Sequence, residues 1–224
     1  WQPEQKIVLE RFEDYYGDKP EFKTVEILTI ENTQSAEMAF DRGEIDDTSI
    51  SLSSVDRYRD KDNAVVHKLT NLRYHWVGFN TQAEPFNDIR VRKAIRYAID
   101  SEEIVEGAYN NVPEVNNCML PEQIMGSWDE CPDYEQDVEK AEELLAEAGH
   151  PNGFNTTIVV GGPDYHSFSA QIIQQQLMRV GINANIKQVE NQYEELKTLP
   201  PVMHYYSFSL NLNQGYWFEW FTCD

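Results

Sequence analysis

Apolar residues recur every three or four positions in the stretch FNDIRVRKAIRYAID, residues 86–100. That spacing predicts a helix with one apolar face, and the basic residues of the stretch take the other face. Asn87 and Asp88 come first and are residue types that commonly cap a helix N-terminus. A second helix is expected after a new cap at Asp100 or Ser101, so the pattern predicts a helical hairpin. The predicted apolar face consists of Ile89, Val91, Ala94, Ile95, Ala98 and Ile99.

Short apolar segments alternate with helical patterns along the rest of the chain. Such alternation predicts an α/β fold in which the strands pair mainly in parallel. In segment 72–80 both sets of alternating side chains are suited to contact with protein, which is typical of a strand covered on both faces. The predicted strands are 6–17, 24–30, 46–52, 72–80, 156–162, 183–190 and 204–210. The first of them runs into an aromatic turn. The predicted helices are 33–43, 55–61, 86–100, 101–111, 137–149, 168–181 and 191–199.

Composition narrows the class of partner. With 224 residues, 41% of them hydrophobic and 12% aromatic, the chain can bury a sizeable core in one large or two modest domains. The 39 acidic and 18 basic residues give a formal charge of −21, so nucleic acid and anionic membrane surfaces are poor partners. No run of about 18 apolar residues occurs that would predict a membrane-spanning helix.

Three cysteines indicate an exported protein more than a metal site. Cys118 and Cys131 flank the loop CMLPEQIMGSWDEC, and a disulfide between them would contribute about 3 kcal/mol in the chain-entropy model. Cys223 is then left to pair with a residue beyond this sequence. The absence of a CxxC motif argues against zinc. Three buried free thiols in a cytosolic protein remain the alternative.

Five blocks of the sequence stand in a characteristic order. They are WQPEQKIVLERFEDYYGDKP, AEMAFDRGEID, GFNTQAEPFNDIRVRKAIRYAIDSEEIVEGAY, DVEKAEELLAEAGHPNGF and QIIQQQLMRVGINANI. Together they resemble the family 5 extracellular solute-binding proteins of ABC importers, which include oligopeptide, dipeptide, nickel and certain glycoside receptors. The resemblance covers essentially the whole chain, which makes it more specific than a single short motif.

The resemblance implies a periplasmic-binding-protein type II fold, in which two lobes close on a ligand. Residues 1–75 would form part of the first lobe and residues 76–224 an incomplete second, C-terminal lobe. Because members of the family are much longer, the resemblance also implies that this sequence is a fragment. The strand that contains GFNT would enter the second lobe, and the helical hairpin would pack on that lobe.

The first candidate ligand contacts are Tyr165 and His166, in the segment GGPDYHSF. This segment follows a predicted strand and precedes a predicted helix, and ligands of open α/β sheets bind beyond the carboxyl ends of strands. In the family this turn faces the cleft. The alternative is that Asp164 or Ser167 only caps the helix and that the imidazole is solvated.

The second candidate group lies in SFSLNLNQGYWFEW. The family commonly carries a WxADYxDP pattern here, whose aspartate can bind the amino group of a peptide. By comparison Phe208 stands at the tryptophan and Asn211 at the aspartate. A neutral amide forms no ion pair with an ammonium group, which favours a sugar, an amide-rich compound or a blocked peptide. Asn213 would add donors and acceptors, and Tyr216 and Trp217 would add stacking faces; simple core packing of alternate residues is the other interpretation.

The resemblance implies an extracytoplasmic solute-binding component of an ABC importer. Such a protein captures a peptide, sugar or metal chelate by lobe closure and delivers it to permease subunits in the membrane. We expect a periplasmic or extracellular monomer, with lipoprotein anchoring left open.

Neither a metal nor a cofactor is expected, because lobe closure needs none. The five histidines are scattered in sequence, which argues against direct binding of nickel. A receptor or chaperone of the same fold without a transport role is the alternative. A hydrolase is less favoured, since GxSxG and HExxH motifs are absent.

Overall fold

The computed structural model describes residues 1–69, 73–118, 134–196 and 202–209. The chain divides into two compact units, Trp1–His67 and Lys68–Asp224. The division falls before strand β3 (Arg73–Phe79), so that whole strand belongs to the second unit. In the described ranges no helix is both long and apolar enough to traverse a lipid bilayer.

The first unit contains a two-stranded ribbon and two short helices. Strands β1 (Lys6–Glu10) and β2 (Thr24–Leu28) pair antiparallel. Helix α1 (Thr33–Asp41) begins at Asn32, whose side chain accepts a hydrogen bond from the Ser35 amide. A short 3-10 turn, η1 (Leu52–Ser54), leads into α2 (Val55–Arg59).

The strand predicted for residues 46–52 does not form. Instead, the buried carboxylate of Glu37 accepts hydrogen bonds of 2.7 Å from the Ser51 amide and from the Ser54 hydroxyl. Tyr58 is also buried, and its hydroxyl donates to the Glu37 carbonyl at 3.1 Å. Side-chain hydrogen bonds therefore take the backbone donor that a strand partner would otherwise satisfy.

The second unit is built on a four-stranded sheet with the strand order β3-β6-β4-β5. β4 (Asn155–Val160) pairs in parallel with β5 (Asn183–Gln188) and with β6 (Met203–Ser209), whereas β3 and β6 pair antiparallel. The expectation of mainly parallel pairing thus holds within this sheet, but its β3 edge and the separate β1–β2 ribbon are antiparallel. The α/β class is confirmed.

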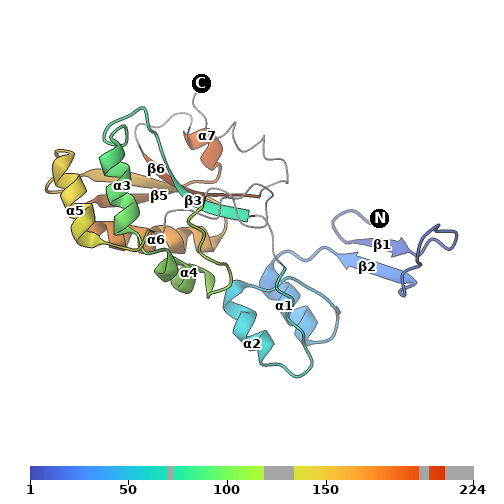
Figure 1. The fold of residues 1–224 in the computed structure, drawn as a ribbon. Helices are drawn as coiled ribbons and strands as arrows, with labels where there is room; N and C mark the ends of the chain where they lie inside the picture. Colours follow the sequence, from blue (N-terminus) through green and yellow to red (C-terminus); the bar gives the residue numbers. More distant parts are fainter. Residues whose placement is uncertain (70–72, 119–133, 197–201, 210–224) are drawn as a thin grey trace. The chain divides into compact units, whose positions relative to one another are not determined.

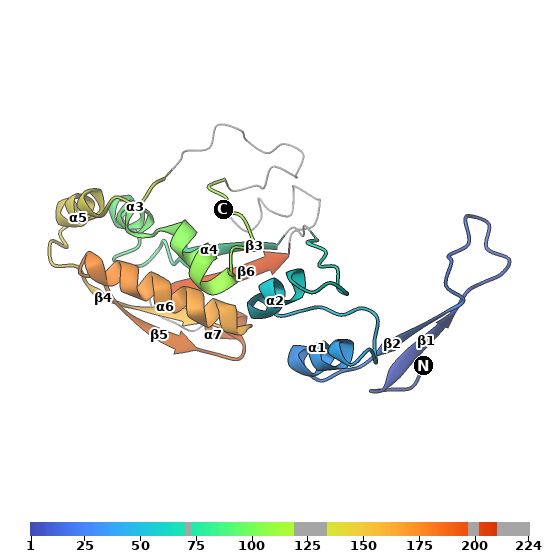
Figure 2. The ribbon, with the colours of Figure 1, turned by 90° about the horizontal axis from the view of Figure 1, so that it is seen from below.

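Helices cover both faces of this sheet. α6 (Asp164–Arg179) joins β4 to β5, and α7 (Gln192–Leu196) joins β5 to β6. Because the two connections run in opposite directions along the sheet, right-handed crossovers place them on opposite faces, as Figure 1 shows. α4 (Ser101–Tyr109) packs beside α6, which is visible in Figure 2.

The predicted helical hairpin is present. α3 (Ile89–Ala98) begins at Asp88 and α4 begins at Asp100, and each of these carboxylates accepts hydrogen bonds from amides in the first turn of its helix. α3 packs on α5 (Val138–Glu147), which is capped by Asp137. The prediction that Ile89 belongs to the buried apolar face of α3 is wrong, because Ile89 is 56% exposed. The other five residues of that face, Val91, Ala94, Ile95, Ala98 and Ile99, are buried.

Cys118 lies at the end of a described range and forms a disulfide. Its carbonyl oxygen accepts a 2.8 Å hydrogen bond from the Tyr74 hydroxyl, which links this segment to β3. The predicted partner, Cys131, lies outside the described residues, and so does Cys223. The Cys118–Cys131 pairing therefore stays a prediction.

Candidate functional site

The candidate site lies where β4 ends and α6 begins. Gly161, Gly162 and Pro163 connect the two elements. A side chain at Gly161 would place its Cβ 2.8 Å from the Val189 carbonyl oxygen, so this close approach of two backbone segments requires glycine. α6 begins four residues earlier than the predicted helix 168–181, and this places Tyr165 and His166 in its first turn and not in a loop.

His166 is buried, with only 4% of its surface exposed. Its Nδ1 lies 2.7 Å from the Gly161 carbonyl oxygen. The other ring nitrogen, Nε2, is also buried and has no hydrogen-bond partner among the described residues. The alternative interpretation of His166 as a solvated side chain beside a helix cap is therefore wrong, and the helix has no side-chain cap.

The His166 ring belongs to a cluster whose members come from four elements. Its centroid lies 5.4 Å from that of His75 on β3, 4.9 Å from that of Tyr165 and 5.5 Å from that of Tyr205 on β6, all with nearly perpendicular planes. Tyr109, at the end of α4, lies 5.1 Å from both His75 and Tyr165. We call these five residues the histidine–tyrosine cluster.

Strand register explains how β3 and β6 contribute to the cluster. His75 pairs with Ser207 and Val77 pairs with Tyr205, so His75 and Tyr205 are diagonal neighbours on one face of the antiparallel pair. Tyr205 also pairs with Val160, the last residue of β4. The cluster therefore sits near the carboxyl end of β4, the edge at which α/β sheets bind ligands.

Two hydrogen bonds of Tyr109 fix the interior of the cluster. Its hydroxyl lies 2.9 Å from His75 Nδ1 and 2.8 Å from the Tyr205 hydroxyl. Ser169, which is fully buried, donates to the Tyr165 carbonyl at 2.8 Å. The bonds of Tyr109 form a continuous polar chain from His75 to Tyr205 in a largely apolar setting, and such chains hold their members in one arrangement.

The environment keeps both imidazoles neutral. Burial, followed by the nearby His166 and Arg73, lowers the pKa of His75 from 6.5 to about 4. The pKa of His166 is also lowered, because burial and the Arg73 charge outweigh the hydrogen bond to Gly161. Burial, with Tyr205 close by, raises the pKa of Tyr109. At neutral pH the cluster thus offers uncharged donors and acceptors beside one guanidinium.

Arg73 connects the cluster to solvent. It lies at the start of β3, its side chain is exposed, and one guanidinium nitrogen donates to the Tyr165 hydroxyl at 3.4 Å. Among the described residues, no group of three or more His, Cys, Asp or Glu side chains is arranged to hold a metal ion. The arrangement suits a polar organic ligand with flat or apolar parts, which aromatic faces and neutral hydrogen-bonding groups recognise.

Sequence reasoning found two of the five members of this cluster. Tyr165 and His166 were selected because they follow a strand, whereas His75, Tyr109 and Tyr205 were missed. Phe208 lies on β6, where its backbone pairs with Tyr74. The remaining residues of the second candidate group, Asn211, Asn213, Tyr216 and Trp217, lie outside the described residues.

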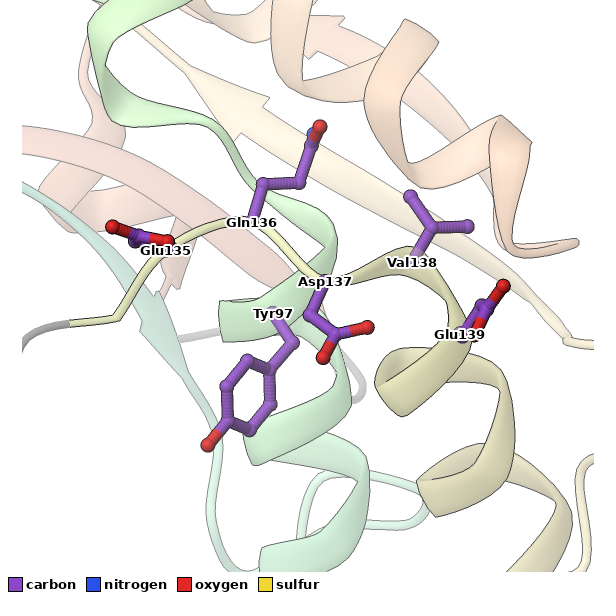
Figure 3. Close-up of a pocket in the computed structure, with 6 residues that line it drawn as sticks. All are labelled: Tyr97, Glu135, Gln136, Asp137, Val138 and Glu139. Atoms are coloured by element: carbon purple, nitrogen blue, oxygen red, sulfur yellow. The ribbon is translucent and has the colours of Figure 1, made fainter.

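A separate hollow of about 520 Å³ lies between the C-terminal part of α3 and the N-terminus of α5. Its lining side chains point in different directions from the chain, as Figure 3 shows. Asp137 caps α5 through the Lys140 amide, and the Gln136 amide donates to the Ala98 carbonyl. Since these polar groups stabilise the packing of α5 against α3, we regard the hollow as part of the helix packing and not as a ligand site. It is lined by Tyr97, Glu135, Gln136, Asp137, Val138 and Glu139.

Comparison with known proteins adds independent information. Residues 1–223 match the model of the bacterial extracellular solute-binding proteins, family 5. Heme-binding protein A of Haemophilus influenzae is 36% identical over 120 residues, which are 51% of this chain and 22% of that protein. Oligopeptide-binding protein AppA of Bacillus subtilis is 28% identical over 208 residues, which are 85% of this chain and 38% of that protein.

Solved structures agree with these matches. The structure of the periplasmic binding protein DppA from Helicobacter pylori in complex with the peptide STSA has a TM-score of 0.74 to this chain. The two are 31% identical, and the similarity covers 97% of this chain and 43% of that one. The chain therefore spans less than half the length of these relatives.

Proposed function

Since the chain belongs to the bacterial extracellular solute-binding proteins of family 5, we propose that it acts as the solute-binding component of an ABC importer. It captures a small solute outside the cytoplasm and delivers it to permease subunits in the membrane. The observation that carries the proposal is the family match over residues 1–223. The histidine–tyrosine cluster near the carboxyl end of β4 supports it, because α/β sheets bind ligands at that edge.

In this proposal the two compact units belong to different lobes. Unit Trp1–His67 is part of the first lobe and unit Lys68–Asp224 is most of the second. The solute shifts the protein from an open to a closed form, because it binds the closed form better, and the permease recognises that form. No bond in the solute is made or broken, so the protein returns its ligand unchanged.

A short peptide is the solute class that we propose. AppA of Bacillus subtilis is described as oligopeptide-binding, and DppA of Helicobacter pylori was solved with the peptide STSA. The cluster suits a peptide because neutral imidazole and tyrosine groups can bond to amides while their ring faces pack on side chains. The protein acts as a monomer in the periplasm or at the cell exterior.

Native mass spectrometry tests this proposal directly. The complete gene product is expressed with export, purified gently and weighed with any small molecule that stays bound. A ladder of short peptide masses, released unchanged after denaturation, is the expected result. A single non-peptide mass, or a peptide that is cleaved during incubation with the purified protein, would contradict the proposal.

A further inference from the structure

The tautomer of His166 is fixed by the structure. The Gly161 carbonyl oxygen can only accept a hydrogen bond, so the ring nitrogen 2.7 Å away, Nδ1, must carry the proton. A neutral imidazole has one N–H group, and the opposite nitrogen, Nε2, therefore presents a lone pair. His166 is thus an acceptor at Nε2 as long as it remains neutral.

That lone pair has no partner within the described residues. Nε2 is buried, and burying an acceptor without a hydrogen bond is costly. Native proteins seldom leave such a group unpaired unless it has a functional use. Two neighbours of the ring, His75 and Tyr165, are only half-buried, so the cluster is partly open to solvent on their side although Nε2 itself is covered.

The surroundings oppose protonation of Nε2. The exposed carboxylate in the first turn of α6, Asp164, forms no ion pair with His166, and the charge that acts on the imidazole is the guanidinium of Arg73. A cationic imidazole would have to form in a buried place beside another cation. Among the described residues, the titratable side chains in contact with the ring are His75 from β3, Tyr165 from α6 and Tyr205 from β6. Arg73 from β3 and Tyr109 from α4 contact those neighbours.

We propose that neutral His166 is a specificity-determining contact that accepts a hydrogen bond at Nε2 from an N–H or O–H group of the solute. This inference rests on the proposed function and states which chemistry the cluster selects. A peptide amide or a hydroxyl side chain can donate the hydrogen bond that Nε2 lacks. A carboxylate cannot, because it would need the imidazole to be protonated first.

Proton linkage distinguishes these two modes of recognition. A solute that donates to Nε2 binds only the neutral imidazole, so binding must lower the pKa of His166 further. A carboxylate would bind the imidazolium and raise that pKa. The affinity for a donating solute is consequently constant above the pKa of His166 and falls in more acidic solution.

The test is an NMR titration of the histidine rings in the complete gene product, labelled with nitrogen-15 in histidine. The probe is the peptide Ser-Thr-Ser-Ala, and His166 is followed in the free and the peptide-saturated protein. The expected results are an Nδ1–H tautomer in the free protein and a fall in the pKa of His166 upon binding. A rise in that pKa, or no change, would overturn the inference while leaving peptide binding established.

Two variants test whether His166 binds the solute through Nε2 or only stabilises the fold. His166→Gln retains an acceptor near the position of Nε2 but does not titrate, so it should bind the peptide within about threefold of wild type and lose the fall in affinity at acid pH. His166→Leu should bind about tenfold more weakly. Equal affinity of both variants at neutral pH would contradict the inference. Failure of the peptide to bind wild type at any pH would instead overturn the peptide assignment, and the inference with it.

Discussion

The β1–β2 ribbon and strand β4 have similar apolar sequences but very different surroundings. Val25 and Ile27 of the ribbon are 45% and 51% exposed, whereas Ile158 and Val159 of β4 are at most 1% exposed. Local patterning thus suffices to form a strand, but burial depends on the elements that pack against it. The second unit supplies those elements itself, and for that reason it can hold a buried polar cluster in a fixed arrangement.

The largest expected effect concerns a close backbone approach in the second unit. Gly153→Ala would drive a Cβ into the carbonyl group of Gly181, and Gly153 also has a φ of 70°. We expect the free energy of unfolding to fall by about 3 kcal/mol or more. Gly149→Ala is the matched control, since its φ is 87° but no atom lies within 4 Å of the added Cβ; it should cost about 1 kcal/mol. Equal losses in urea titrations would show that the packing between these turns is not tight.

The next effect is a dependence of stability on pH that arises in the cluster. The unfolded chain binds protons at histidine with a pKa near 6.5, while folded His75 does so at about 4. The contribution of His75 to stability is therefore fully present above pH 6.5 and is lost as the pH falls toward 4, which amounts to about 3 kcal/mol. His75→Gln should reduce that loss, and the matched change at exposed His67 in the first unit should not. A stability that is constant between pH 7 and 4.5 would contradict the assignment of a buried neutral His75.

A smaller effect on the free energy of unfolding comes from making the same substitution in β4 and in the β1–β2 ribbon. Val159→Thr introduces a hydroxyl into a fully buried strand and should cost about 1 to 2 kcal/mol. Val25→Thr makes the same change in the exposed ribbon and should alter the free energy of unfolding by less than about 0.5 kcal/mol. Thermal or urea unfolding of the two variants measures the difference. If Val25→Thr costs as much as Val159→Thr, the ribbon is buried by another part of the protein under the conditions of the measurement.

Local chemistry predicted much of the fold. The caps of α3 and α4 are visible in the sequence because Asp88 and Asp100 act on amides within three residues. The prediction of a strand at 46–52 is wrong because the carboxylate of Glu37, many residues away in sequence, accepts the hydrogen bond of the Ser51 amide. Likewise, the start of α6 was placed too late, since Pro163 can precede a helix without a side-chain cap.

The candidate site was predictable only in part. Tyr165 and His166 stand directly after a strand, and that position is a signal in the sequence. His75 and Tyr205 lie on β3 and β6, and only the register of these strands brings them together. Tyr109 ends a helix and reaches them through tertiary packing. A histidine within a largely apolar strand was the one local signal for His75, and it does not reveal its partners.

Peptide affinity in a pair of variants tests the central claim most directly. Tyr165→Ala removes a ring shared by the cluster, whereas Phe168→Ala removes an aromatic side chain that is 51% exposed on the same helix. Calorimetric titration of the complete gene product with Ser-Thr-Ser-Ala should show at least tenfold weaker binding for Tyr165→Ala and unchanged binding for Phe168→Ala. Equal affinities of the two variants and wild type would contradict the placement of the solute at the histidine–tyrosine cluster.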